Sequence, residues 1–290
     1  MPFEIFQTSP AAFMAAALIL GLLVGSFLNV VIYRLPVMMQ RAWQREAAAM
    51  QGVDSGDEAQ AEPAPFNLVT PNSTCPKCGH KIKPWENIPI ISYLFLRGRC
   101  SNCKTRISPR YPIIEAVTGL LSVLIAWQFG FGIETAALLL FVWCLVALTM
   151  IDVDHQLLPD SLTLPLLWLG LLLNLTEVFA PLSSAVIGAV AGYLSLWSIY
   201  WAFKLLTGKE GMGYGDFKLF AAFGAWFGWS ALPLIILLSS LVGAVVGIAM
   251  IVLMGRDKQI PIPFGPYLCG AALVYVFWGE ALMNWYLGTL

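Results

Sequence analysis

Eight apolar runs, separated by short polar stretches, divide most of the chain. A helix that crosses about 30 Å of hydrocarbon needs about 20 predominantly apolar residues. The runs cover residues 12–33, 113–131, 135–151, 161–179, 184–206, 217–229, 231–254 and 263–287, and the third and sixth are short. The pattern therefore predicts an all-α polytopic membrane protein with about eight transmembrane helices.

The amino-acid composition supports this class. Hydrophobic residues occupy 59% of the 290 positions and charged residues 11%, whereas soluble domains carry about 25% charged residues. The first residues lack the basic region of a cleaved signal peptide, so we expect the first apolar run to be retained as a span.

The placement of positive charge predicts an orientation. All sixteen Lys and Arg lie in, or within one turn of, the connections 34–112, 152–160, 207–216 and 255–262. Because cytoplasmic connections are enriched in Lys and Arg, we expect these four on the cytoplasmic face and both termini on the opposite, periplasmic face.

The long first connection gives the expected domain organisation. Residues 1–33 form the first transmembrane helix, residues 34–112 a cytoplasmic insertion between the first and second spans, and residues 113–290 a seven-helix transmembrane domain. An acidic, Ala-rich tract at 54–62 indicates that residues 34–70 are partly flexible linker.

Two CxxC pairs in the insertion predict a structural metal site. Cys75 and Cys78 precede Cys100 and Cys103 by an interval slightly longer than the usual one, and paired CxxC knuckles are typical of four-thiolate zinc sites. Nearby His80 could replace one ligand. Cys144 and Cys269 stand alone in apolar runs, where a small core residue is the simpler interpretation.

Two polar stretches adjoin predicted spans on the same face, and each carries an acid. Asp152 ends the third run and Asp216 opens the sixth, so they could meet, and Gly213 and Gly215 would permit a close backbone approach before Asp216. Two carboxylates about 4 Å apart repel by about 4 kcal/mol at an effective dielectric of 20. Such a pair shares one proton, which is the chemistry of aspartic proteases.

Other interpretations of these acids remain open. Asp152, Asp154 and Asp160 could hold Mg²⁺ against a diphosphate, as in a membrane prenyl or phospholipid transferase. A transporter could use the acids as a proton relay, although no acid lies in the middle of a span. For Asp154, His155 and Asp160 we favour solvated helix ends, with Asp160 as an N-cap.

Seven motifs in order resemble one known family. They are residues 25–36 (GSFLNVVIYRLP), the double CxxC, 84–89 (PWENIP), 110–115 (RYPIIE), 151–155 (IDVDH), 211–218 (GMGYGDFK) and 263–266 (PFGP). Together they cover nearly the whole chain, which is similar to the bifunctional type IV prepilin peptidases and N-methyltransferases of the bacterial inner membrane.

The resemblance implies an activity, a catalytic pair and a methyl donor. Asp152 and Asp216 would be the catalytic aspartates, with Asp154 not essential. The partners would be prepilins and type II secretion pseudopilins, each with a basic leader joined to a hydrophobic helix, and no nucleic acid is expected. After cleavage the enzyme would methylate the new N-terminus with S-adenosylmethionine. No glycine-rich fingerprint locates that cofactor, and Glu86, Asn87 and Gly98 of the insertion are the candidates for its site.

Overall fold

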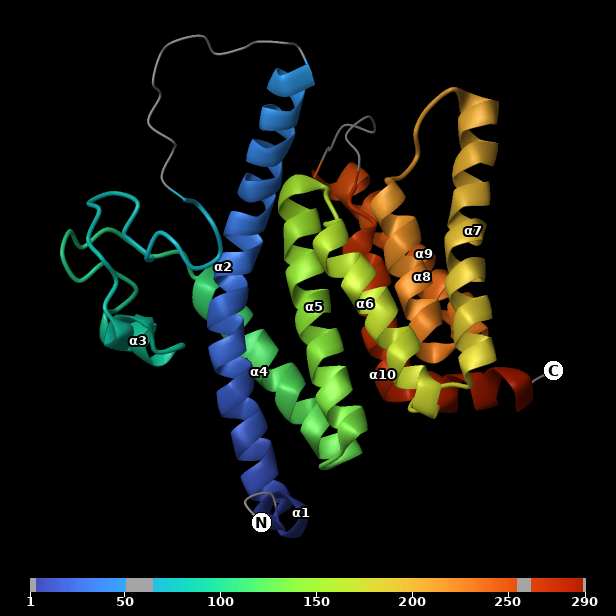
Figure 1. Cartoon of the computed structure of the whole chain (residues 1–290), viewed down its shortest axis with the longest axis horizontal. Helices are drawn as coiled ribbons and strands as arrows, with labels where there is room; N and C mark the ends of the chain where they lie inside the picture. Colours follow the sequence, from blue (N-terminus) through green and yellow to red (C-terminus); the bar gives the residue numbers. More distant parts are fainter. Residues whose placement is uncertain (1–3, 51–64, 255–261, 289–290) are drawn as a thin grey trace. The chain divides into compact units, whose positions relative to one another are not determined.

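The computed structural model describes residues 4–50, 65–254 and 262–288. The described residues are helical apart from turns and two isolated β-bridges. They form two compact units, Met1–Phe131 and Gly132–Leu290, whose elements are drawn in Figure 1. The two units meet at Phe131/Gly132, directly after the second predicted span. The domain boundary expected from the sequence lay at 112/113, directly before that span.

The first unit consists of two long helices and the insertion between them. Helix α2 (Pro10–Met50) follows the short α1 (Glu4–Thr8), and α4 (Arg110–Phe129) closes the unit. The insertion contains the 3-10 helix η1 (Pro84–Asn87) and α3 (Ile91–Phe95). Helix α2 continues through Pro36 to Met50, so this part of the partly flexible linker expected at 34–70 is helical. The acidic tract at 54–62 lies outside the described residues.

Glycines bring α2 and α4 into close contact. A Cβ atom at Gly21 would lie 2.9 Å from the Gly119 Cα, and one at Gly25 would lie 2.8 Å from the Glu115 Cα. No larger side chain fits at either position without moving the facing backbone. These glycines therefore pack within the chain.

The second unit is a helical bundle. Its elements are α5 (Ile133–His155), α6 (Asp160–Leu173) with η2 (Asn174–Thr176), α7 (Leu182–Thr207), α8 (Tyr214–Phe227), η3 (Trp229–Ala231), α9 (Leu232–Met254) and α10 (Gly265–Gly288). Figure 1 shows α8 beside α6 and α7. Phe217, Phe220, Phe223 and Trp226 of α8 are all fully or almost fully buried, so α8 forms the core of this unit.

The helices match the eight predicted runs in position but not all in length. Among the described residues, six helices are long and apolar enough to cross a membrane, in α2, α4, α5, α7, η3–α9 and α10. The run predicted at 161–179 is a shorter apolar helix ending at Thr176, and α8 has 14 residues. In the described ranges, the helices of full spanning length therefore number six rather than about eight.

The side chain of Asn174 explains why α6, the helix of the fourth predicted run, ends early. Its Nδ2 donates to the carbonyl oxygens of Ala225 and Trp226, both at 2.9 Å, and its Oδ1 accepts the N–H groups of Phe179 and Ala180 at 3.0 and 3.1 Å. One buried amide thus satisfies both the end of α8 and the turn after η2. Trp226 adds a second tie, since its Nε1 donates to the Leu166 carbonyl at 2.8 Å.

We expect Asn174→Ala to lower the free energy of unfolding by about 3 kcal/mol, because buried backbone groups left without partners cost about 1–3 kcal/mol each. Thermal unfolding of the detergent-solubilised protein measures the change. Thr176→Ala is the control, since its exposed hydroxyl bonds only the Leu173 carbonyl. Equal stability of the two variants would contradict the role given to Asn174.

Candidate active site and metal centre

Asp152 lies in the last turn of α5 and is only 5% exposed. The N–H of Gly265, the first residue of α10, donates a buried hydrogen bond to its Oδ2 at 3.0 Å. A backbone N–H at a helix N-terminus stabilises a carboxylate through both the hydrogen bond and the helix dipole. The fold therefore fixes the Asp152 carboxyl with a donor 113 residues away in the sequence.

Asp216 lies in the first turn of α8 and is 6% exposed. The N–H of Gly213 donates to its Oδ2 at 3.2 Å. The other oxygen, Oδ1, is buried, and no hydrogen-bond partner for it occurs in the described part of the chain. A buried carboxylate oxygen without a donor is costly, so this atom is available for a proton, a water molecule or a substrate.

Leu158 connects the surroundings of the two aspartates. A Cβ atom at Gly215 would lie 2.7 Å from the Leu158 Cβ, and one at Gly265 would lie 3.2 Å from its Cδ2 and 2.7 Å from the Asp152 Oδ2. The two carboxyl groups are close enough for their charges to repel each other. The second unit thus brings Asp152 and Asp216 together.

The two glycines before Asp216 differ in their role. Gly215 permits the close approach that the sequence suggested. Gly213 does not, since its φ is −86° and a Cβ there would meet nothing nearer than 3.9 Å. Its backbone instead donates its N–H to Asp216 Oδ2 and accepts the Asp216 N–H, both at 3.2 Å. Two features of the site were not predicted from the sequence: the Gly265 N–H as a donor, and Leu158 as the residue that both Gly215 and Gly265 approach. The PFGP motif nevertheless included Gly265.

The other acids of the first polar stretch are not gathered into a cation site. Asp154 is exposed, and both oxygens of Asp160 accept hydrogen bonds from the Lys218 ammonium at 2.7 Å. Within the described ranges, the four cysteines are the one group of three or more possible metal ligands. The expectation that Asp160 is an N-cap is wrong, since Pro159 is the N-cap and Asp160 begins α6. His155, the last residue of α5, is exposed as expected.

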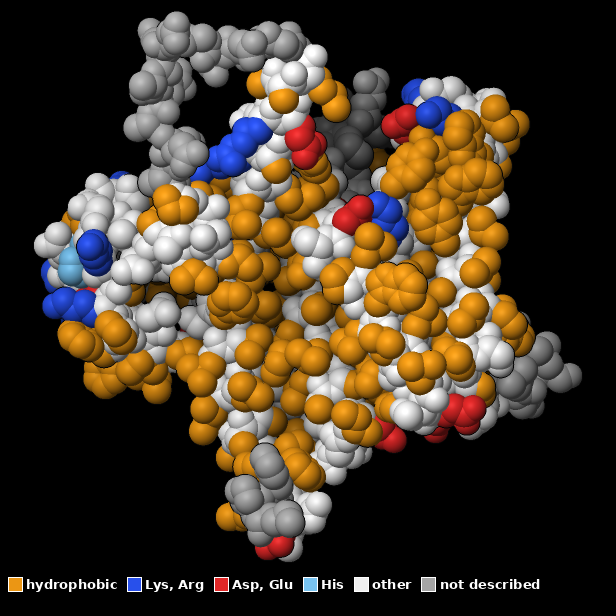
Figure 2. Space-filling view, in the orientation of Figure 1, with side chains coloured by type: hydrophobic (Ala, Val, Ile, Leu, Met, Phe, Trp, Pro, Cys, Tyr) orange, Lys and Arg blue, Asp and Glu red, His pale blue; other side chains and the backbone are white. Residues whose placement is uncertain are grey.

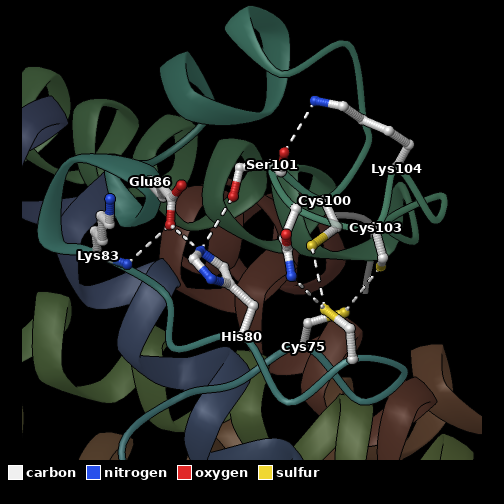
Figure 3. A network of polar contacts seen from close by, with 10 residues as sticks. Cys75, His80, Lys83, Glu86, Cys100, Ser101, Cys103 and Lys104 are labelled. Carbon is white, nitrogen blue, oxygen red and sulfur yellow. Dashed lines mark hydrogen bonds and ion pairs between the residues drawn. The ribbon is translucent and has the colours of Figure 1, made fainter.

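The four paired cysteines converge in the insertion, as Figure 3 shows. Their sulfur atoms all lie within 4.8 Å of one another, with Cys75 and Cys103 separated by 3.8 Å and Cys78 and Cys100 by 4.0 Å. Four sulfur atoms bound tetrahedrally to zinc at about 2.3 Å lie about 3.8 Å apart. The cluster therefore fits a tetrahedral metal ion.

Two similar turns build this cluster. In the first, the Cys75 N–H donates to the His80 carbonyl and the Gly79 N–H to the Cys75 carbonyl. In the second, the Cys100 N–H donates to the Thr105 carbonyl and the Lys104 N–H to the Cys100 carbonyl. Gly79 and Lys104 both have positive φ, 69° and 57°. The repeated CxxC spacing thus produces the same turn twice.

His80 is not part of the cluster. Its Nε2 lies 3.3 Å from Glu86 Oε2 and 3.1 Å from Ser101 Oγ, a network visible in Figure 3. The Lys83 N–H also donates to Glu86, and this bond, with the nearby Ser101 and His80, lowers the pKa of Glu86 to about 2. Glu86 is therefore an ionised structural tie at neutral pH.

The candidates for the methyl donor site are not equivalent in their surroundings. Glu86 is occupied by the network around His80. Gly98 has a φ of 65°, donates its N–H to the Tyr93 carbonyl and accepts the Ile107 N–H, so it supports the local fold. Asn87 ends η1 and is exposed.

Two buried charged residues in the first unit also escaped the sequence analysis. Arg34 donates to the carbonyl oxygens of Asn67 and Pro71 at 2.9 and 2.6 Å. Glu115 accepts the Ile90 N–H at 2.7 Å. Both lie in motifs noted in the sequence, 25–36 and 110–115, and they tie the insertion to α2 and α4.

Comparisons with known proteins agree on one family. Residues 19–129 match the model of the bacterial Peptidase A24 N-terminal domain, and residues 139–248 match that of the type IV leader peptidase family. No solved structure matches the chain significantly.

Curated relatives match over nearly full length. A prepilin leader peptidase/N-methyltransferase of Stutzerimonas stutzeri is 58% identical over 99% of this chain and 98% of its own. Those of Pseudomonas aeruginosa and Neisseria gonorrhoeae are 57% and 52% identical, over 98% and 96% of this chain and 97% and 96% of theirs. The chain belongs to the prepilin leader peptidase/N-methyltransferase family of multi-pass bacterial membrane proteins.

Proposed function

We propose that Asp152 and Asp216 hydrolyse the bond between a prepilin's leader and its mature chain. The observation that carries the proposal is the burial of two neighbouring carboxyl groups, each held by one backbone N–H, with Asp216 Oδ1 left without a partner among the residues that the structure describes. Such a pair retains one proton, since ionising both side by side in a water-poor site is costly.

The shared proton supports a direct attack of water on the scissile peptide. The ionised carboxylate takes a proton from the water as its oxygen bonds to the carbonyl carbon. The neutral carboxyl donates its proton to the carbonyl oxygen, forming a tetrahedral intermediate. Collapse breaks the C–N bond, and a carboxyl proton passes to the departing amine. The proton belongs to the pair, so either aspartate can be the base.

The substrate class follows from the activity of the family and from the membrane setting. Prepilins and pseudopilins present a basic leader in the cytoplasm, joined to a hydrophobic helix. In the orientation suggested by the Lys and Arg pattern, the polar ends of α5 and α8 face the cytoplasm. That placement suits a scissile bond at the cytoplasmic membrane boundary.

For this orientation we propose that α6 with η2, and α8, also cross the membrane. The 17 residues from Asp160 to Thr176 would extend about 25 Å and the 14 residues of α8 about 21 Å at 1.5 Å per residue. Both helical segments are shorter than the roughly 30 Å of hydrocarbon. Polar groups of the protein would therefore lie close to both ends of each segment. Eight crossings then place both termini in the periplasm.

The first unit is the proposed location of zinc binding and methyl transfer. Cys75, Cys78, Cys100 and Cys103 would hold structural zinc, as their sulfur spacing suggests. S-adenosylmethionine would supply an electrophilic methyl group to the new N-terminal amine: the N–C bond would form as the S–CH3 bond breaks, S-adenosylhomocysteine would leave, and the amine would lose a proton. Of the three candidate residues, exposed Asn87 is the most accessible to such a ligand.

We expect Asp152→Asn and Asp216→Asn each to lower the cleavage rate at least about a hundredfold, the lower end of general acid–base contributions. Asp154→Asn is the matched control and should keep substantial activity. The measurement is the rate at which a purified prepilin loses the mass of its leader, recorded by mass spectrometry with EDTA in the reaction. An inactive Asp154→Asn beside an active Asp152→Asn would move the assignment, and a Mg²⁺ requirement would favour a transferase.

Substitutions should affect leader cleavage and N-methylation separately. Cys75→Ser and Cys103→Ser should lower the zinc content and abolish methylation of a pre-trimmed pilin, because the insertion loses a ligand. The two Asp→Asn variants should methylate that pilin at a near normal rate. Zinc analysis and methyl incorporation on the same preparations provide the measurement, with Cys144→Ala as control. Folded aspartate variants that fail to methylate would show that the sites are shared.

The proposed orientation predicts opposite labelling of two exposed positions. Ser183→Cys, in the first turn of α7, should react with an impermeant maleimide from the periplasm. Lys209→Cys, after the end of α7, should react only once the cytoplasmic side is opened. The reverse result would overturn the orientation.

A further inference from the structure

Large apolar side chains project from the insertion without covering one another. Trp85 of η1 is 65% exposed, and Leu94 and Phe95 of α3 are 67% and 85% exposed. Ile88, which lies between these elements, and Ile91, the first residue of α3, are also exposed. Figure 2 shows apolar side chains gathered at one edge of the insertion. We call these five residues the apolar edge; an exposed apolar patch on so small a module marks an interaction surface.

A hydrogen bond fixes the depth of the apolar edge relative to a membrane helix. Glu115 lies five residues into α4, about 7.5 Å along the helix at 1.5 Å per residue. Its carboxylate accepts the N–H of Ile90, the residue that precedes α3, at 2.7 Å. Ile90 has a φ of 58°, a strained value for a β-branched residue, so this bond holds α3 in a set position. Helix α3 therefore lies beside the first turns of a spanning helix.

The other end of the insertion is tied at a similar boundary. Arg34 lies in α2 where the apolar run 12–33 ends, and its guanidinium binds the carbonyl oxygens of Asn67 and Pro71. Two ties, one to each membrane helix of the first unit, thus keep the insertion at the membrane surface.

The charges around the apolar edge identify its partner. Lys83, Arg97 and Arg99 are exposed beside it, and the Lys83 ammonium lies 5.4 Å from the centre of the Trp85 ring. Glu86, the acid in this segment, is engaged by the Lys83 N–H and His80. A Trp and aliphatic side chains bordered by Lys and Arg match the boundary between acyl chains and anionic headgroups. A basic leader peptide would be repelled by the same charges.

We propose that the apolar edge inserts into the membrane interface and that Lys83, Arg97 and Arg99 bind anionic phospholipid headgroups. The lipid bilayer would then be a third support for the insertion, beside the ties at Arg34 and Glu115. This proposal does not depend on which residues perform cleavage or methylation.

Photocrosslinking of the full chain tests the proposal. Phe95 is replaced by p-benzoylphenylalanine, and the zinc-loaded protein is placed in phosphatidylglycerol-containing nanodiscs. Lys77, exposed in the first CxxC turn and outside the apolar edge, receives the same photolabel as a control. We expect several-fold more lipid adduct, detected by mass, from position 95 than from position 77. Equal yields would overturn the proposal.

A second comparison isolates the charges. Arg97→Glu with Arg99→Glu should lower the adduct yield at position 95 in phosphatidylglycerol discs and change it little in phosphatidylcholine discs. An unchanged yield in both would overturn the headgroup contact. Addition of prepilin gives the competing result: if position 95 crosslinks to prepilin in place of lipid, the apolar edge is a substrate surface and the proposal is wrong.

Discussion

The placing of two carboxyl groups in a buried position is the constraint on which the second unit depends. If both were ionised, Asp152 and Asp216 would repel each other, and neither has a basic side chain as a hydrogen-bond partner among the contacts of the described residues. Their support comes from two backbone N–H groups, those of Gly265 and Gly213. Both donors belong to the first turn of a helix or precede it directly, where N–H groups have no partner within the helix.

This arrangement requires α8 and α10 to be held accurately against α5. The close approach of backbone to Leu158 and Asp152 leaves no room for a Cβ atom at Gly215 or Gly265. At the far end of α8, Asn174 binds the last carbonyl groups of the helix, and Trp226 is hydrogen-bonded to α6. Along its side, Gly192 of α7 brings that helix within contact of the Phe220 carbonyl. The proposed catalytic pair is therefore supported along the whole length of α8.

The sequence could predict features that depend on local spacing. Apolar runs located the helices because a membrane requires long unbroken hydrophobic segments, and the CxxC spacing located the cysteine cluster because each knuckle is a local turn. Helix α2 beyond Arg34 was missed, although residues 38–50 contain many good helix formers, because their polarity was read as a linker. The Gly265 donor and the Asn174 clamp could not be predicted, since both are contacts between segments far apart in the chain.

The pH dependence of leader removal tests the central claim of a shared-proton pair most directly. If one aspartate must be ionised and the other protonated, kcat/KM will fall on both the acidic and the alkaline side of an optimum. Samples returned to neutral pH after each incubation exclude irreversible unfolding. A rate that rises with pH and then stays level through the alkaline range would contradict the account, because a single base without a neutral partner would then be sufficient.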